Sequence, residues 1–306
     1  MKPKIIVTDK IHASAVDIMR QFADVDVELD LSKDELIEKI PKYQGIAVRS
    51  STKVTGDVIS AGGNLKIIAR AGVGLDNIDL EAAGKRYIKV VNAPESLTLA
   101  VCELVFGLLL SLVRNIASAD RSMRQNRWEK SRFLGTELYG KTMGLVGFGR
   151  IGREVALRAR AFGMSTLVYD PYITDEDAEE FYAKMVQVDE LLKNSDFVSL
   201  HTPLTEKTEK FMNSEKISLM KKTAVLINTS RGGVVDQGAL IEALKKGKIA
   251  GAALDVYETE PPGESELYGM DNVVLTPHIG ASSQEAQSKA GTIVAEKMRN
   301  FFSETG

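Results

Sequence analysis

The segment GLVGFGRIGREVALRARAFGMSTLVYD, residues 144–170, decides the fold of this chain. Its glycines Gly147, Gly149 and Gly152 match G-x-G-x-x-G, a strand pattern comes before them, and an amphipathic helix pattern begins near Arg150. Glycines at these positions allow a tight turn and a close approach of phosphate, and the helix N-terminus offers unpaired N–H groups. A lone glycine motif is weak evidence, but the strand and the helix on either side indicate a phosphate-binding turn.

A carboxylate at the end of the next strand indicates which dinucleotide this turn would hold. Asp170 closes the strand pattern 166–170, 18 residues after Gly152, close to the spacing of about 20 residues for a ribose-binding acid. It can accept hydrogen bonds from ribose hydroxyls and would repel a 2′-phosphate. The alternative, a glycine turn followed by a surface Asp, explains fewer of these features. The sequence therefore predicts NAD as the cofactor.

The length and the charge of the chain limit its class. A chain of 306 residues suits two domains better than one. With 44% hydrophobic and 26% charged residues it can bury an ordinary core. The net charge is −3 and the basic residues are spread along the sequence, so no nucleic-acid surface is expected. An anionic small-molecule substrate would need a local basic site.

The single cysteine and the distribution of apolar residues predict a cytoplasmic protein. Cys102 cannot form an intrachain disulfide and lies in the apolar run 99–113, where we expect it to be buried. The N-terminus has no apolar signal core, and the longest uncharged apolar run, 104–113, is too short to cross a membrane. We expect no membrane partner and no metal site.

Short β-branched runs alternate with longer helical patterns along the chain. Most of the runs are continuously apolar, as in strands whose two faces are both covered by helices. The strand candidates are 4–9, 45–50, 66–71, 88–93, 142–147, 166–170, 196–201, 224–230, 251–256 and 272–277. This rhythm predicts an α/β fold with two Rossmann-like domains built on parallel sheets.

Two boundaries divide the pattern into domains. One lies near Pro94, before a helical stretch from about 97 to 125. The other lies near residue 282, where Ser282 and Glu285 have capping-box spacing and open the last helix. We predict a substrate-binding domain of residues 1–95 and 283–306, which is discontinuous and flavodoxin-like, and an NAD-binding Rossmann domain of residues 96–282.

Three histidines are the candidates for the proton partner of a hydride transfer. His12 lies in a polar segment, and we expect it at the surface. His201 ends a strand near the expected cofactor, and we expect it to have a structural hydrogen bond. His278 ends the strand 272–277 and is followed by glycine and small residues, which suits a cleft. We therefore predict that His278 is the functional histidine.

Charged residues follow two other strands. Arg231 comes directly after the strand 224–230, in a turn that two glycines keep open, and it can grip a carboxylate in bidentate fashion. Asp255, Glu258 and Glu260 follow the strand 251–256, and any of them could raise the pKa of a histidine and orient its ring. Ligands of open parallel sheets bind at such strand ends.

Together these segments resemble the D-isomer-specific 2-hydroxyacid dehydrogenases, and within that family the phosphoglycerate branch. The resemblance covers essentially the whole chain and rests on VRSSTKVT, RAGVGLDNIDLEAA, GTELYGKTMGLVGFGRIGREVA, HTPLTEKT, NTSRGGVVD, GAALDVYETEPP and PHIGASSQEAQ. It implies that Arg231, Glu260 and His278 are catalytic, with Glu260 chosen because it directly precedes the two prolines. It also implies that Val73 and Gly74 meet the substrate carboxylate and that Arg49 lies near the substrate phosphate.

The resemblance also extends the set of residues expected to contact NAD. The full set is Gly147, Gly149, Arg150, Ile151, Gly152, Asp170, Thr202, Thr229, Ser230, Asp255, Gly280 and Ala281.

The implied activity is NAD-dependent oxidation of 3-phosphoglycerate, the first step of serine biosynthesis. One alternative is another enzyme of the family, such as a glyoxylate or hydroxypyruvate reductase, although a small uncharged tail would not need Arg49. The other is a non-enzymatic NAD-sensing scaffold of this fold, which a turnover assay would distinguish.

Two further expectations concern assembly and regulation. A homodimer is expected through residues 97–125, because that stretch is too apolar to face solvent and the family dimerises there. No serine feedback site is expected, because the residues that form a regulatory domain in longer relatives have no counterpart after the closing helix.

Overall fold

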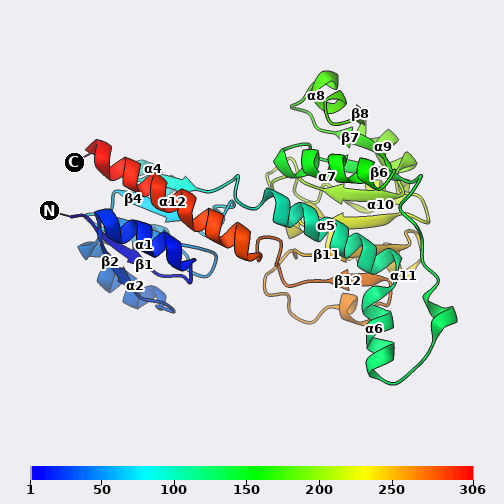
Figure 1. Cartoon of the computed structure of the whole chain (residues 1–306), viewed down its shortest axis with the longest axis horizontal. Helices are drawn as coiled ribbons and strands as arrows, with labels where there is room; N and C mark the ends of the chain where they lie inside the picture. Colours follow the sequence, from blue (N-terminus) through cyan, green and yellow to red (C-terminus); the bar gives the residue numbers. More distant parts are fainter. Residues whose placement is uncertain (1, 306) are drawn as a thin grey trace. The chain divides into compact units, whose positions relative to one another are not determined.

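The computed structural model describes residues 2–305 and divides into two compact units. Unit 1 contains the chain up to Ala100 together with the chain from Ala281 onward, and unit 2 contains Val101–Gly280 (Figure 1). The last helix thus belongs to the same unit as the first strand, as the predicted discontinuous arrangement requires.

Unit 1 is built on a five-stranded parallel sheet with the order β2-β1-β3-β4-β5. The strands are β1 Lys4–Val7, β2 Asp24–Val27, β3 Gly45–Val48, β4 Ile67–Arg70 and β5 Lys89–Asn92. The helices are α1 Ala13–Phe22, α2 Lys33–Lys39, α3 Gly56–Ala61, α4 Leu80–Lys85 and α12 Gln284–Thr305, with a 3₁₀ turn at Ile40–Lys42. Successive strand residues contribute to opposite cores: Ile67 packs with α1 and α12, and Ile68 packs with α2–α4.

Unit 2 is built on a seven-stranded parallel sheet with the order β12-β11-β10-β9-β6-β7-β8. The strands are β6 Thr142–Val146, β7 Ser165–Tyr169, β8 Ala183–Met185, β9 Phe197–Leu200, β10 Val225–Asn228, β11 Gly251–Leu254 and β12 Val273–Leu275. The helices are α5 Thr98–Val113, α6 Ile116–Arg124, α7 Arg150–Ala161, α8 Asp175–Glu179, α9 Val188–Asn194, α10 Ser214–Leu219 and α11 Gln237–Lys245. Short 3₁₀ turns lie at Lys130–Phe133, Gly232–Val234 and Glu266–Gly269.

All ten predicted strands are present, and the α/β fold with parallel sheets is confirmed. β2 and β8 were not predicted, and each lies at one of the two edges of its sheet. β2 has the sequence DVDV, and its residues are exposed or half-buried. An edge strand with one unpaired side does not need the continuous apolar run of a central strand, so its sequence carries a weaker signal.

The helical stretch predicted for residues 97–125 is two helices. α5 and α6 meet at a bend of 62°, where Asn115 adopts the left-handed conformation. Val105, Phe106 and Leu109 of α5 are buried in the core of unit 2, and so is Cys102, as predicted. These side chains are therefore covered within unit 2, whereas Leu99 at the start of α5 is 52% exposed.

Within residues 2–305 no single helix is both long and apolar enough to cross a membrane, and α5 with α6 reaches that threshold only as a bent pair.

The last helix begins one residue later than its capping-box pattern predicts. α12 starts at Gln284, and the Ser283 hydroxyl accepts a hydrogen bond from the Ala286 N–H at 3.1 Å. The predicted pairing of Ser282 with Glu285 is therefore wrong by one position. α12 packs against α1, β4 and β5, so the C-terminal segment completes the core of unit 1.

Candidate active site

The glycine turn between β6 and α7 leaves open space on one side only. A side chain at Gly147, whose φ is +94°, would lie 2.7 Å from the His201 carbonyl oxygen, and one at Gly152 would lie 2.6 Å from the Gly147 carbonyl oxygen. Nothing lies within 4 Å of the corresponding position at Gly149. The N-terminus of α7 has no side-chain cap. The turn is thus closely packed at Gly147 and Gly152 and open at Gly149, where a pyrophosphate could approach the backbone.

The Asp170 carboxylate is hydrogen-bonded to this turn and can still accept hydrogen bonds from a ribose. Its Oδ2 accepts a hydrogen bond from the Phe148 N–H at 2.8 Å, and its Oδ1 accepts one from the Tyr172 N–H at 2.9 Å. A carboxylate has about four lone-pair positions, so it can still accept from ribose hydroxyls. The sequence pattern located the acid, but it gave no sign of the bond to Phe148.

Two buried hydroxyls at strand ends support the fit of a ligand. The Oγ1 atoms of Thr202, after β9, and Thr229, after β10, are buried and have no hydrogen-bond partner among the described residues. Buried polar groups are normally hydrogen-bonded, and an unpaired one is costly. Both threonines were predicted to contact the cofactor, and a bound dinucleotide would supply the missing partners.

The candidate acid–base pair is formed in unit 2. His278 Nδ1 lies 2.6 Å from Glu260 Oε2. Glu260 is held in turn by the Tyr257 N–H, which donates to Oε1 at 3.1 Å. With its proton on Nδ1 and donated to Glu260, the neutral ring has Nε2 available as the proton acceptor. Both side chains are partly exposed, so the ring can meet a ligand.

The buried carboxylate of Asp255 holds the turn that carries His278. Asp255 is 0% exposed and accepts hydrogen bonds from the Thr276 hydroxyl at 2.6 Å and from the N–H groups of Ile279 and Gly280, both at 2.8 Å. His278 lies between these anchors with φ +52°, in the left-handed region. Sequence reasoning had given Asp255 as a contact with NAD and as one of three acids that could orient a histidine ring, and it missed these bonds to the turn.

The structure separates the acids that the strand pattern left as alternatives. Glu260 contacts His278, whereas Glu258 accepts a hydrogen bond from the Gln237 N–H at 3.2 Å, at the start of α11. Burial raises the pKa of Tyr257 to about 12, so its hydroxyl stays protonated and donates to the Thr276 carbonyl at 2.9 Å. Tyr257 thus contacts both Glu260 and the strand that leads to His278.

Arg231 lies in a turn that a buried asparagine organises. Asn228 donates to the Arg231 carbonyl at 2.9 Å and accepts from the N–H and the hydroxyl of Ser230, at 3.0 and 2.8 Å. A side chain at Gly232 would overlap the backbone carbonyl of Tyr257. The turn of Arg231 and the segment that leads to Glu260 are therefore neighbours. Asn228 was not predicted, because an apolar strand ending in Asn is common outside such sites.

The other two histidines have the roles expected of them. His201 makes a hydrogen bond with the Ser199 hydroxyl at 3.0 Å, and burial lowers the pKa of its ring to about 4. It is therefore neutral near pH 7 and is a poor proton carrier. His12 is exposed and caps α1 by accepting a hydrogen bond from the Ser14 N–H at 3.3 Å.

The predicted substrate contacts Arg49, Val73 and Gly74 belong to unit 1. Arg49 directly follows β3, and Val48 pairs in register with Arg70 at the end of β4. The Val73 carbonyl accepts a hydrogen bond from the Asn92 side chain at 2.6 Å. Sequence reasoning missed Arg70, although it ends the predicted strand 66–71 as Arg49 ends 45–50. The carboxyl edge of this sheet therefore carries two arginines on neighbouring strands.

The chain is similar to known proteins over nearly its whole length. Residues 106–280 match the family model of the D-isomer specific 2-hydroxyacid dehydrogenase NAD-binding domain. The chain is 52% identical to the D-3-phosphoglycerate dehydrogenase of Methanocaldococcus jannaschii, over 98% of this chain and 57% of that protein. It is 47% identical to the hydroxypyruvate reductase of Thermotoga maritima, over 99% of this chain and 98% of that protein.

A solved structure shows the same fold. It is D-lactate dehydrogenase from Aquifex aeolicus complexed with NAD and lactic acid, with a TM-score of 0.85 and 31% identity over 98% of this chain and 96% of that one. The chain spans a little over half the length of the first phosphoglycerate dehydrogenases that it matches.

The depressed pKa of His201 predicts a loss of stability in mild acid. The unfolded chain binds a proton on this histidine below about pH 6.5, whereas the folded chain does so only near pH 4. The free energy of unfolding should therefore fall as the pH is lowered from 6.5 towards 4. Thermal melting at several pH values should show a shallower decline for His201→Gln than for the wild type. Equal slopes would contradict the assigned pKa.

Proposed function

The chain belongs to the D-isomer specific 2-hydroxyacid dehydrogenase family, and on that premise we propose that it oxidises D-3-phosphoglycerate to 3-phosphohydroxypyruvate with NAD. The proposal is supported chiefly by the His278–Glu260 pair, which lies in the same unit as the open glycine turn. This reaction would be the first step of serine biosynthesis.

The residues present fit NAD. The turn at Gly149 and the N-terminus of α7 would hold the pyrophosphate, Asp170 would accept from the adenosine ribose, and Thr202 and Thr229 would use their unpaired hydroxyls. NAD supplies the acceptor for a hydride. The Asp170 carboxylate disfavours a 2′-phosphate at the same place, which favours NAD over NADP.

The acid–base step follows from the arrangement of the pair. When the C2 alcohol becomes a ketone, the hydroxyl proton passes to Nε2 of His278 as the hydride leaves C2. Nδ1–H then donates to Glu260, whose negative charge stabilises the imidazolium. Arg231 would bind the substrate carboxylate in bidentate fashion and, in the reverse direction, polarise the ketone.

Arg49 supports a phosphorylated substrate. Arg231 is assigned to the carboxylate at the reacting end, so a second arginine suits a second anion at the other end of a three-carbon acid. Among the described residues of unit 1, the Arg49 guanidinium has no hydrogen bond or ion pair. A second candidate substrate is hydroxypyruvate, which the name of the Thermotoga maritima relative favours.

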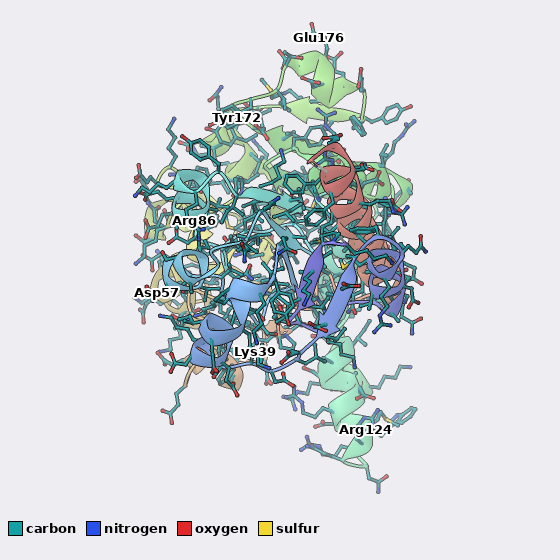
Figure 2. The ribbon with its side chains drawn as sticks, turned by 90° about the vertical axis from the view of Figure 1, so that its left-hand side faces the viewer. Lys39, Asp57, Arg86, Arg124, Tyr172 and Glu176 are labelled. Atoms are coloured by element: carbon teal, nitrogen blue, oxygen red, sulfur yellow. The ribbon has the colours of Figure 1, made fainter. Side chains whose placement is uncertain are left out.

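Assembly into a homodimer is part of the proposal, through α6, which lies within the predicted stretch 97–125, and the segment that follows it. Large apolar side chains are exposed along α6 and the segment after it, with Leu134 91% and Trp128 79% exposed and Ile116 and Met123 about half exposed. In Figure 1 this segment extends away from the seven-stranded sheet, and Figure 2 shows Arg124 at the end of α6. Such a set of exposed apolar side chains is typical of an interaction surface.

Substitution of the candidate base should stop turnover without removing cofactor binding. His278→Ala should lower kcat by about 10²–10⁴-fold, the usual contribution of general acid–base catalysis. NAD affinity, measured by fluorescence titration, should be little changed. The matched control is His12→Ala, at an exposed helix cap, which should keep wild-type kcat. Near-normal turnover of His278→Ala would remove this histidine from the mechanism.

The substrate assignment is tested by comparing two acids. Arg49→Ala should lower kcat/KM for 3-phosphoglycerate by about 10–150-fold, equivalent to about 1.5–3 kcal/mol for hydrogen bonds to charged groups. It should barely change kcat/KM for hydroxypyruvate, which lacks the phosphate.

Arg20→Ala, at an exposed arginine on α1 of the same unit, is the control for charge alone. An equal loss on both acids would mean that Arg49 acts on the fold or on the carboxylate. Wild-type protein that turns over hydroxypyruvate but not 3-phosphoglycerate would favour the reductase instead.

Disruption of the exposed apolar segment should produce a monomer. Light scattering at micromolar concentration should give a dimer for the wild type and a smaller mass for Leu134→Glu, because a charge would be buried at the contact. Tyr172→Glu changes an equally exposed apolar side chain elsewhere in unit 2 (Figure 2) and should remain dimeric. A monomeric wild type would contradict the proposal.

A further inference from the structure

A buried carboxylate organises the loop that carries Arg49. Asp9, the second residue after β1, is only 5% exposed. It accepts hydrogen bonds from the N–H groups of Arg49 at 2.5 Å and Thr52 at 3.0 Å, and from the Thr52 hydroxyl at 2.6 Å. The Ser51 N–H adds a longer bond at 3.2 Å. The donors of residues 49–52 therefore converge on one side chain from a different strand.

A second side chain holds the acceptors of the same loop. The Asn77 amide donates to the Arg49 carbonyl at 3.0 Å and to the Thr52 carbonyl at 2.7 Å. The Asn77 carbonyl accepts from the Val54 N–H, so Asn77 is itself anchored where the loop ends. Asp9 and Asn77 thus bind the N–H and C=O groups of one loop from two directions.

The backbone N–H and the backbone C=O of Arg49 are therefore both hydrogen-bonded. Its N–H is bound to Asp9 and its C=O to Asn77, whereas its guanidinium has no partner among the described residues of unit 1. Four donors of the loop surround the Asp9 carboxylate and occupy its lone pairs. The carboxylate therefore does not need an ion pair with the Arg49 guanidinium. This arrangement leaves the charged end of Arg49 available to a ligand.

We propose that Asp9 and Asn77 are positioning residues that orient Arg49 and thereby set the preference for a phosphorylated over an unphosphorylated three-carbon acid. This inference rests on the proposed function, in which Arg49 binds the substrate phosphate. A bidentate arginine contact requires a fixed geometry, and holding the backbone in advance lowers the ordering cost at binding. The effect should therefore be confined to substrates with a group that Arg49 can reach.

The test compares steady-state kinetics of Asp9→Asn and Asn77→Ala on 3-phosphoglycerate and hydroxypyruvate. Each variant should raise KM for 3-phosphoglycerate about tenfold with kcat nearly unchanged, the pattern for loss of uniform binding. Kinetic constants for hydroxypyruvate and KM for NAD should stay within about twofold of the wild type. A loss of fold alone would affect both substrates alike.

Matched controls come from the same unit. Asp57→Asn changes an exposed acid that pairs with Lys33 at the surface (Figure 2), and Asn64→Ala removes an amide that donates to the Pro41 carbonyl at 2.8 Å. Both should leave the ratio of kcat/KM for the two acids as it is in the wild type. If buried Asp9→Asn does not fold, as judged by thermal melting, half-buried Asn77→Ala decides the question.

The outcomes separate the two proposals. Wild-type protein without activity on 3-phosphoglycerate would overturn both the proposed substrate and this inference. Wild-type protein that prefers 3-phosphoglycerate, with Asn77→Ala losing equally on both acids or losing on neither, would overturn the inference alone. A selective rise of KM for 3-phosphoglycerate in Arg49→Ala and also in the two positioning variants would support it.

Discussion

The site in unit 2 depends on the buried Asp255 carboxylate. Three hydrogen bonds to residues 276–280 hold His278 in a left-handed conformation, which is unfavourable for a residue with a side chain. Without that anchor the ring would have no fixed relation to Glu260. The carboxylate can remain buried because its lone pairs are taken by strong donors. The proton-transfer pair is therefore only as well placed as the turn that Asp255 holds.

The alternating strand and helix patterns could be predicted from the sequence. The hydrogen bonds between segments that are distant in the sequence could not. The ten strands with continuous apolar runs were predicted, whereas the polar edge strands β2 and β8 were not. Charged residues at strand ends were found by position and residue type. The bonds of Asp9, Asn228 and Asp255 to backbone turns could not be predicted, because a single acid or amide after a strand has many possible partners until the fold is known.

Hydrophobicity alone does not show which apolar residues of the stretch 97–125 are exposed. α5 is apolar around its circumference, and Val105, Phe106 and Leu109 are buried within unit 2. The exposed apolar residues lie in the more polar α6 and in the irregular segment after it, where periodicity gives little information. Composition distinguishes a buried helix from an amphipathic one. It does not show which other elements pack against the apolar side chains of the buried helix.

The packing of α12 against α1 has a consequence for synthesis on the ribosome. Ala290, Val294 and Met298 fill the same core as Ile5 and Met19, and all of unit 2 is translated between them. The first five strands therefore emerge with one face of their sheet covered by α1 but not yet by α12, while unit 2 can already fold as a continuous segment. The core of unit 1 is therefore completed only after α12 has been translated.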